Sequence, residues 1–235
     1  MLFRSSIHSA VDRAYLLRQL GLYAEARLEE AALIRQARDT VERLLETAVA
    51  FSRRGEPAQA LRLATRALAL GAERNQTLLT LLYPVLRPDA LLSLAQERDL
   101  DPALVAGLIR QESNFDPSAT SRAGARGLMQ ILPGTGSHIA RRERYPVWDP
   151  VLLYQPDVSL EMGTTHLASL VNSYGHANYV LAAYNAGGTR LRRWQRRAGV
   201  DDPELFVERI PYRETRDYVK IVQTNREVYA GLYGW

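Results

Sequence analysis

Apolar and alanine residues recur every three or four positions along most of this 235-residue chain, and this period limits the fold more than any other feature. The spacing persists from Val11 to Leu70 with no sustained strand-like alternation. It returns in three later segments, residues 158–174, 177–184 and 213–229. The sequence therefore predicts an all-α protein.

Two stretches in the second part of the chain interrupt the helical period. Residues 113–136 hold four glycines and two prolines, and residues 145–156 hold three prolines. Glycine and proline at this density are typical of loops and turns. We therefore predict two loop-rich interruptions, with a short helix at 91–98 before the first of them.

Two short segments of the first part resemble each other. Gly21–Ala26 reads GLYAEA and Gly55–Ala60 reads GEPAQA, so their glycines lie 34 residues apart. That is the period of tetratricopeptide (TPR) repeats, in which a glycine-bearing turn joins two helices. Generic helical hairpins with a coincidental spacing explain the pattern equally well. Pro84 and Pro88 follow, so we predict a helical-hairpin segment over 1–88 and a second domain over 89–235.

Composition excludes several kinds of site. The chain has no cysteine, and its four histidines lack the spacing of metal ligands, so we expect no disulfide and no metal site. No segment approaches the ~18 uninterrupted apolar residues of a membrane span, so we expect no integral membrane segment. The first residues lack the apolar core of a secretory signal, which leaves open whether Met1 is the native start. The net charge of +4 permits an anionic partner without requiring one, and we expect a monomer.

One carboxylate stands on the apolar face of a predicted helix. The Asp-Pro pair at 101–102 gives an N-cap and a first helical residue. Val105, Leu108 and Ile109 then form the buried stripe, and Glu112 takes the next position at i+7, in the last turn. Burial and the negative end of the helix dipole both disfavour the ionised form, so we expect a raised pKa. A raised pKa suits a general acid near neutral pH. The simpler alternative is that the helix end has already left the core, so that Glu112 is an ordinary surface glutamate.

Four motifs surround and follow this glutamate. They read ESNFDP at 112–117, GARGLMQ at 124–130, AYNAG at 183–187 and IPYRETRDYV at 210–219. In this order and spacing they resemble the catalytic domain of the soluble lytic transglycosylases, lysozyme-like enzymes that cleave peptidoglycan. The resemblance covers roughly residues 90–230 and implies a lysozyme-like all-α catalytic domain. The helical first part resembles a short piece of the superhelix that precedes this domain in larger members.

The resemblance also implies a role for each matching residue. Glu112 corresponds to the single catalytic acid/base. Tyr184 corresponds to a tyrosine near that carboxyl, and we expect its hydroxyl to donate to the carboxyl or to the acetamido oxygen of the substrate; a core tyrosine is the alternative. The other expected substrate contacts are Ser121 and Gln130 for the N-acetylated sugars, Met129 as an apolar sugar contact, Asn185, and Glu214 and Tyr218 in the motif that closes over the cleft.

A single carboxyl suffices for the chemistry that the resemblance implies if the substrate supplies the nucleophiles. The 2-acetamido oxygen of N-acetylmuramic acid would attack its own anomeric carbon, and the 6-hydroxyl would then form a 1,6-anhydro ring. We expect Glu112 to protonate the leaving β-1,4 oxygen and later to take the proton of the 6-hydroxyl. Glu214, flanked by Arg213 and Arg216, is expected to stay ionised. The resemblance thus implies peptidoglycan glycan strands as the partner, a periplasmic or cell-envelope location, and no cofactor.

Other interpretations stay open on the sequence alone. A muramidase would hydrolyse the same bond with water and a second carboxylate. An inactive domain would act as a peptidoglycan-binding helical scaffold, although intact Glu112, Gln130 and Tyr184 argue against it. The arginine-rich run from Arg190 to Arg197 fits a solvated helix face, a contact with peptide-stem carboxylates, or nucleic acid. We expect no nucleic-acid partner.

Overall fold

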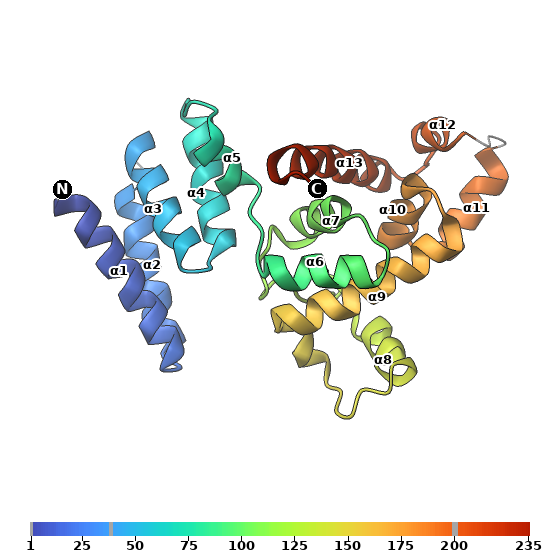
Figure 1. The fold of residues 1–235 in the computed structure, drawn as a ribbon, viewed down its shortest axis with the longest axis horizontal. Helices are drawn as coiled ribbons and strands as arrows, with labels where there is room; N and C mark the ends of the chain where they lie inside the picture. The colour runs from blue at the N-terminus through green and yellow to red at the C-terminus, as the bar shows by residue number, and fades with distance from the viewer. Residues whose placement is uncertain (1, 38–39, 199–201) are drawn as a thin grey trace. The chain divides into compact units, whose positions relative to one another are not determined.

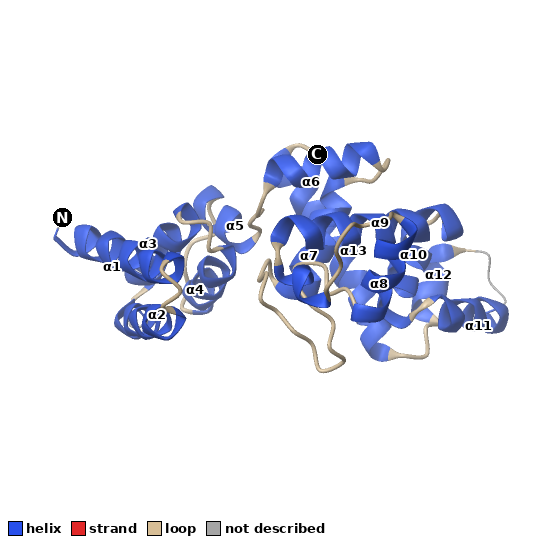
Figure 2. Ribbon diagram, turned by 90° about the horizontal axis from the view of Figure 1, so that it is seen from below, coloured by secondary structure: helices blue, strands red, loops and turns tan. Residues whose placement is uncertain are grey.

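The computed structural model describes residues 2–37, 40–198 and 202–235 (Figure 1). Within these residues there is no strand, and Figure 2 shows only helices and loops. Two isolated β-bridges, Thr120 with Arg126 and Arg126 with Ile131, are the extended pairings there. The predicted all-α class is therefore confirmed. No helix in this part of the chain is both long enough and apolar enough to cross a bilayer.

The chain forms two compact units, which divide between Leu86 and Arg87. The predicted boundary, after residue 88, lies two residues further along. The first unit contains α1 (Leu2–Gln19), α2 (Tyr23–Ala37), α3 (Val41–Arg53), α4 (Pro57–Ala69) and α5 (Gln76–Leu82).

The first unit is built from two equivalent helical hairpins. Helix α1 packs against α2, and α3 packs against α4. Gly21 and Gly55 form the two turns with φ of 78° and 72°, a left-handed backbone that glycine adopts without steric cost. Ala26 and Ala60, each five residues after its glycine, are both 0% exposed. The 34-residue spacing therefore marks matching turns and matching small residues at the helix contacts.

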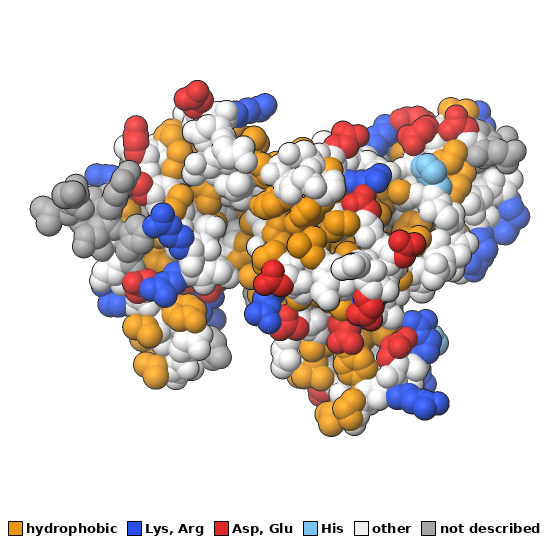
Figure 3. Space-filling view, in the orientation of Figure 1, with side chains coloured by type: hydrophobic (Ala, Val, Ile, Leu, Met, Phe, Trp, Pro, Cys, Tyr) orange, Lys and Arg blue, Asp and Glu red, His pale blue; other side chains and the backbone are white. Residues whose placement is uncertain are grey.

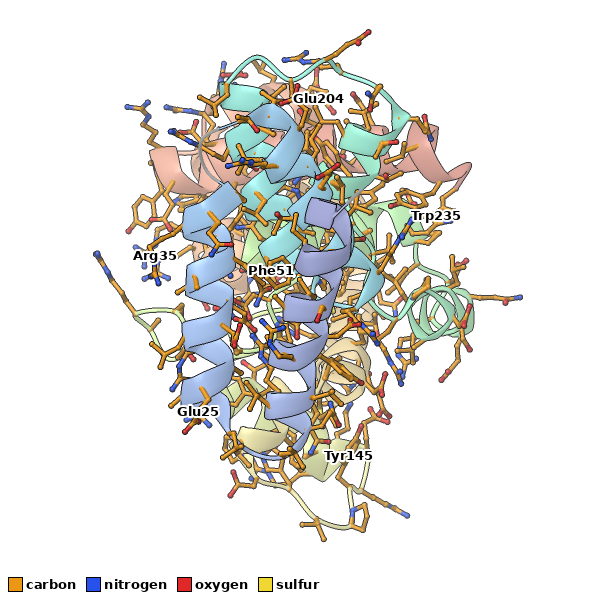
Figure 4. All side chains as sticks on the ribbon, turned by 90° about the vertical axis from the view of Figure 1, so that its left-hand side faces the viewer. Glu25, Arg35, Phe51, Tyr145, Glu204 and Trp235 are labelled. Atoms are coloured by element: carbon orange, nitrogen blue, oxygen red, sulfur yellow. The ribbon has the colours of Figure 1, made fainter. Side chains whose placement is uncertain are left out.

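The hydrophobic core of the first unit lies between these helices. Leu44 and Phe51 of α3 are buried there with Leu63 of α4 and Leu78 of α5. Phe51, labelled in Figure 4, points in among the helices. This core gives the first unit an apolar interior of its own.

The second unit contains the remaining helices. They are α6 (Pro88–Glu97), α7 (Pro102–Ser113), α8 (Pro133–Arg142), the 3₁₀ helix η1 (Pro150–Tyr154), α9 (Pro156–Tyr174), α10 (Ala177–Ala186), α11 (Gly188–Ala198), α12 (Pro203–Glu208) and α13 (Arg213–Tyr233). Six of these nine elements begin with proline, whose fixed φ and missing N–H suit the first helical position. Many of the prolines therefore start helices instead of only ending them.

The predicted loops are shorter than expected. Helix α8 begins at Pro133, so Gly134 and Gly136 are helical residues and not loop residues. A Cβ on Gly136 would lie 2.6 Å from the ring of Trp148, which explains why a glycine is needed at that helical position. The second predicted loop, residues 145–156, contains η1. Helices α8 and α12 were not expected from the sequence.

Close packing of α7 on α13 brings distant motifs together. A Cβ on Gly107 would lie 2.9 Å from the backbone nitrogen of Arg226, so glycine lets the two backbones approach. The Asn225 amide donates to the Gly107 carbonyl at 3.2 Å, and Arg226 pairs with Asp101 at the start of α7. This contact places the first turns of α13 beside the last turn of α7.

Candidate active site

Glu112 lies where α7 passes from the core to the surface. The Asp101 side chain caps α7 by accepting from the backbone N–H groups of Ala103 and Leu104, at 2.8 and 3.3 Å. Residues 103–109 are all buried, and Glu112 follows in the last turn, half-buried. The helix ends at Ser113, and its C-cap residue Asn114 has a left-handed φ of 52°. Glu112 lies on the side of α7 that contacts α13.

The environment of Glu112 keeps a proton on its carboxyl near neutral pH. Burial raises its pKa from 4.5 to about 7. A hydrogen bond from the Tyr218 hydroxyl acts in the opposite direction and is the smaller effect. The expected direction of the shift is therefore present, and the carboxyl is poised to give and to take a proton at neutral pH.

Tyr218 is the hydroxyl that holds the Glu112 carboxyl. It lies in the second turn of α13, is 5% exposed, and donates to Glu112 Oε1 at 2.6 Å. Burial and the negative charge of Glu112 raise the pKa of Tyr218 well above its ordinary value. Tyr218 therefore stays protonated and remains a hydrogen-bond donor.

Tyr184 lies near the carboxyl but directs its hydroxyl elsewhere. Burial and the charge of Glu112 raise the pKa of Tyr184 well above its ordinary value, which reports the proximity of the two groups. Its hydroxyl donates to the backbone carbonyl of Met129 at 2.7 Å. The expected bond from Tyr184 to the carboxyl is thus absent in this structure, and Tyr218 makes that bond instead.

The loop between α7 and α8 is fixed through its main chain by three helices. Ser113 of α7 donates from Oγ to the Leu128 carbonyl at 2.8 Å. Ser159 of α9 accepts from the Met129 N–H at 3.2 Å, and Tyr184 of α10 donates to the Met129 carbonyl. The GARGLMQ segment is therefore held in place on both sides of Met129.

Met129 is fully buried in this structure, and its expected role as an apolar sugar contact stays a prediction. Its side chain is 0% exposed, so it offers no surface to a sugar in this structure. A Cβ on Gly163 of α9 would lie 2.2 Å from the Met129 sulfur, so the side chain packs directly on the helix backbone. An apolar residue in a motif is compatible with either a core or a ligand contact, and in this structure Met129 makes a core contact with α9.

Gln130 lies in a turn of the chain, and its side-chain amide N–H is hydrogen-bonded to the backbone. Its φ is 49°, and its Nε2 donates to the carbonyls of Gly127 at 2.9 Å and Ala119 at 3.1 Å. The amide oxygen has no partner among the described residues, so it is the part of Gln130 that is available to a ligand as an acceptor. Gly127 has φ of 75°, and a Cβ there would lie 1.9 Å from the Leu153 carbonyl oxygen.

The remaining expected contacts lie around this group. Asn185 Oδ1 accepts from the Thr215 hydroxyl at 2.7 Å, which ties the end of α10 to the start of α13. Ser121 is exposed, and its Oγ accepts from the Ala125 N–H at 3.0 Å. Glu214 is exposed in the first turn of α13. Their roles toward a substrate stay predictions.

Several residues that complete the site were missed from the sequence. Ser113, Ser159 and Thr215 position the loop and the helix ends described above. His166 of α9 places its ring 5.2 Å from that of Tyr184, and burial lowers its pKa. Ser113 and Thr215 carried a sequence signal, since they lie within the motifs at 112–117 and 210–219. In the part of the chain that the structure describes, no three His, Cys, Asp or Glu side chains gather as metal ligands.

Comparison with known proteins agrees with this geometry. Residues 90–207, half of the chain, match the family described as "Transglycosylase SLT domain". Over 155 residues the chain is 35% identical to the soluble lytic murein transglycosylase of Salmonella typhimurium, an alignment that covers 65% of this chain and 24% of that protein. The corresponding Escherichia coli K12 protein is 36% identical over the same length and coverage.

Two solved structures share the fold. The 70 kDa soluble lytic transglycosylase of Escherichia coli superposes with a TM-score of 0.82 and 28% identity, covering 96% of this chain and 36% of that one. The lytic transglycosylase Slt of Pseudomonas aeruginosa gives a TM-score of 0.78 and 26% identity, covering 98% and 37%. The chain thus spans about a quarter of the length of these curated relatives and little more than a third of these solved chains.

Proposed function

Because this chain belongs to the transglycosylase SLT domain family, we propose that it is a peptidoglycan lytic transglycosylase with Glu112 as its acid/base. It cleaves the β-1,4 bond between N-acetylmuramic acid and N-acetylglucosamine and leaves a 1,6-anhydromuramoyl end. The observation that carries this proposal is the half-buried Glu112 carboxyl, with a pKa of about 7 and a hydrogen bond from Tyr218 at 2.6 Å. One group with this pKa can serve first as an acid and then as a base at neutral pH.

The reaction proceeds in two steps without consuming water. Protonated Glu112 gives its proton to the glycosidic oxygen as the C1–O bond breaks, and the acetamido oxygen bonds to C1. The Glu112 carboxylate then takes the proton of the 6-hydroxyl, O6 bonds to C1, and the acetamido oxygen leaves. Both nucleophiles belong to the same sugar, so each attack has the advantage of a tethered group. The Tyr218 hydroxyl holds the carboxyl in one orientation through both steps.

The charges around Glu112 support a single-carboxylate mechanism over hydrolysis. Retaining and inverting glycosidases keep their two carboxyls about 5–5.5 and about 6.5–9.5 Å apart, respectively. Among the described residues, Glu112 is the only carboxylate whose charge raises the pKa of Tyr184 or Tyr218. The acidic residue of the last motif, Glu214, is exposed to solvent. A muramidase would need a second carboxyl close to these tyrosines.

The relatives support the same assignment. One solved neighbour is a glutamate variant of the Pseudomonas aeruginosa enzyme, substituted by glutamine and described as inactive. The relatives are named as soluble or membrane-bound lytic murein transglycosylases. These names support our proposal that the protein acts on glycan strands in the cell envelope. We further propose the periplasm as its compartment and a monomeric state.

Mass spectrometry of digested peptidoglycan tests this proposal. Purified peptidoglycan is incubated with the protein at pH 6 to 7, and the soluble fragments are analysed without reduction. Anhydro ends, one water lighter than the products of a muramidase digest run in parallel, are the expected result. Hydrolysed ends would assign the chain as a muramidase. Binding without soluble fragments would assign it as a non-catalytic scaffold.

Bulgecin A gives a second test that needs no turnover. The 70 kDa soluble lytic transglycosylase has been solved in complex with this compound. If the Glu112 site is assembled in the same way here, bulgecin A raises the melting temperature of this protein. The expected shift grows with ligand concentration, and its absence at saturating concentration would count against a shared site.

A further inference from the structure

Helix α11 is amphipathic, and its exposed side carries arginine. Its sequence from Gly188 to Ala198 is GTRLRRWQRRA. Leu191 and Trp194 are 0% and 5% exposed and attach the helix to the second unit. Blue side chains mark the outer edge of α11 in Figure 3. The exposed arginines, called the arginine face below, are Arg190, Arg192, Arg193 and Arg196.

The arginine face has no compensating acid in the described part of the chain. Arg192 donates to the neutral Tyr174 hydroxyl at 2.9 Å, whereas cations nearby are paired, as Arg213 is with Asp217. Like charges at i and i+4, such as Arg192 and Arg196, destabilise a helix. The helix dipole favours cations only in the last turn, so it does not explain Arg192. The side chain of Arg197, part of the predicted run, lies outside the described residues.

Helix α11 is joined to the elements of the candidate active site. Gly187 alone separates it from α10, the helix of Tyr184. The Arg190 guanidinium lies 5.9 Å from the ring centroid of Tyr212, and the Trp194 ring lies 5.2 Å from the same ring. Tyr212 directly precedes α13, the helix that carries Tyr218. The arginine face therefore belongs to the same group of packed helices as Glu112's hydrogen-bond partner.

We propose that the arginine face binds the carboxylates of the peptide stems carried by the glycan strand, an inference that rests on the proposed function. Stems are attached to the lactyl group of N-acetylmuramic acid and carry several carboxylates. A guanidinium matches a carboxylate with two parallel hydrogen bonds, which gives Arg an advantage over Lys in such contacts. Arg193 and Arg196, about one helical turn apart, can each take one carboxylate of the same stem.

Charge complementarity favours a peptide stem over nucleic acid. Tight binding to a nucleic-acid backbone neutralises many phosphates, about 6–10 in strongly salt-dependent complexes. The arginine face offers four guanidiniums on an 11-residue helix, in a chain with a net charge of +4. Four cations match the few carboxylates of one stem better than a long phosphate backbone.

The test compares glycan fragments with and without stems. The fragments are muropeptide-bearing oligosaccharides and the same oligosaccharides after removal of the stems by an amidase. Binding is measured by calorimetry on a Glu112→Gln background, so the readout does not require turnover. The variant is Arg193→Gln with Arg196→Gln. The matched control is Arg62→Gln with Arg66→Gln, which removes two exposed arginines from α4 in the first unit.

We expect the α11 variant to weaken binding of stem-bearing fragments about 3- to 10-fold, as exposed ion pairs do, and to leave stem-free fragments unchanged. The control should change neither. Equal weakening of both fragments, or no change, would overturn the proposal. Loss of binding to a single-stranded oligonucleotide, with stem binding intact, would identify the face as a nucleic-acid site and would also overturn it. Failure of the proposed function shows separately, as absence of anhydro products from the unmodified chain.

Discussion

The Tyr218 hydroxyl donates to the Glu112 carboxyl at 2.6 Å, across 106 residues of sequence. The bond joins the last turn of α7 to the second turn of α13. It orients the carboxyl, and it moderates the rise in pKa that burial causes. Burial raises the pKa of Glu112 and the Tyr218 hydrogen bond lowers it, and substitutions can separate these two effects.

Replacing Glu112 by Gln should abolish turnover, by at least about 10³-fold, because the amide cannot exchange the proton. The same change should stabilise the fold in a pH-dependent way. The unfolded carboxyl ionises near pH 4.5 and the folded one near 7, so Glu112's stabilising contribution is complete below 4.5 and is lost as pH rises through 7. The variant should therefore gain about 1–3 kcal/mol at pH 8 and almost nothing at pH 4.

Urea unfolding at the two pH values measures this difference. Glu73→Gln, which removes an exposed carboxylate from the first unit, is the matched control and should show no such pH dependence. A Glu112→Gln protein that keeps substantial activity while folded would remove Glu112 from the central role.

Replacing Tyr218 by Phe should shift the pH profile and not only the rate. The lost hydrogen bond had lowered the pKa of Glu112, so that pKa rises further and the alkaline limb of kcat/KM moves up by about one pH unit. Loss of orientation should reduce the optimal rate about 10-fold. The measurement is kcat/KM from pH 5 to 9. An alkaline limb that stays in place would mean that Tyr218 does not control the carboxyl.

Replacing Tyr184 by Phe should cost stability more than catalysis. The substitution leaves the Met129 carbonyl without its 2.7 Å partner, which costs about 1–3 kcal/mol in unfolding free energy. The alkaline limb should stay where it is, and the rate should fall less than about 10-fold. A loss of 10²–10³-fold at unchanged stability, the effect typical of an oriented donor in the transition state, would instead show that this hydroxyl acts on the substrate.

Residues 87–235 should fold and cleave peptidoglycan without the first unit. They contain all four motifs and begin with Arg87, whose guanidinium makes two hydrogen bonds to Asp157 at 2.7 and 2.6 Å. Activity on soluble glycan strands should stay within about threefold of the full chain. A shorter control that starts at Leu100 loses α6, with its buried Leu91 and Ala95, and should fail to fold. A folded but inactive 87–235 protein would show that the first unit contributes to the site.

Local sequence predicted the elements that packing does not alter. The periods at 158–174, 177–184 and 213–229 give α9, α10 and α13 within a few residues. Helix α8 was not predicted, because Gly134 and Gly136 are typical of loops. No local signal in the sequence shows that Gly136 makes room for Trp148.

The candidate site also has a part that the sequence predicts and a part that only the packing of the helices decides. Helical spacing predicted the position of Glu112 on α7, and the motif resemblance then selected it as the acid/base. The donor to its carboxyl lies 106 residues away, so spacing cannot choose between Tyr184 and Tyr218. Motif resemblance brought both tyrosines to the site, but the packing of α7 on α13 decides which one reaches the carboxyl.

The partial exposure of Glu112 links the filling of the site to the state of its proton. In the free protein this carboxyl still touches solvent, and its pKa is about 7. A sugar seated over it removes that remaining water and disfavours the charged form further. We therefore expect binding of the proposed substrate above pH 7 to take up a proton, so that the enthalpy of binding depends on the ionisation enthalpy of the buffer. Substrate bound over Glu112 would thus keep the carboxyl protonated at pH values where the empty site has lost that proton.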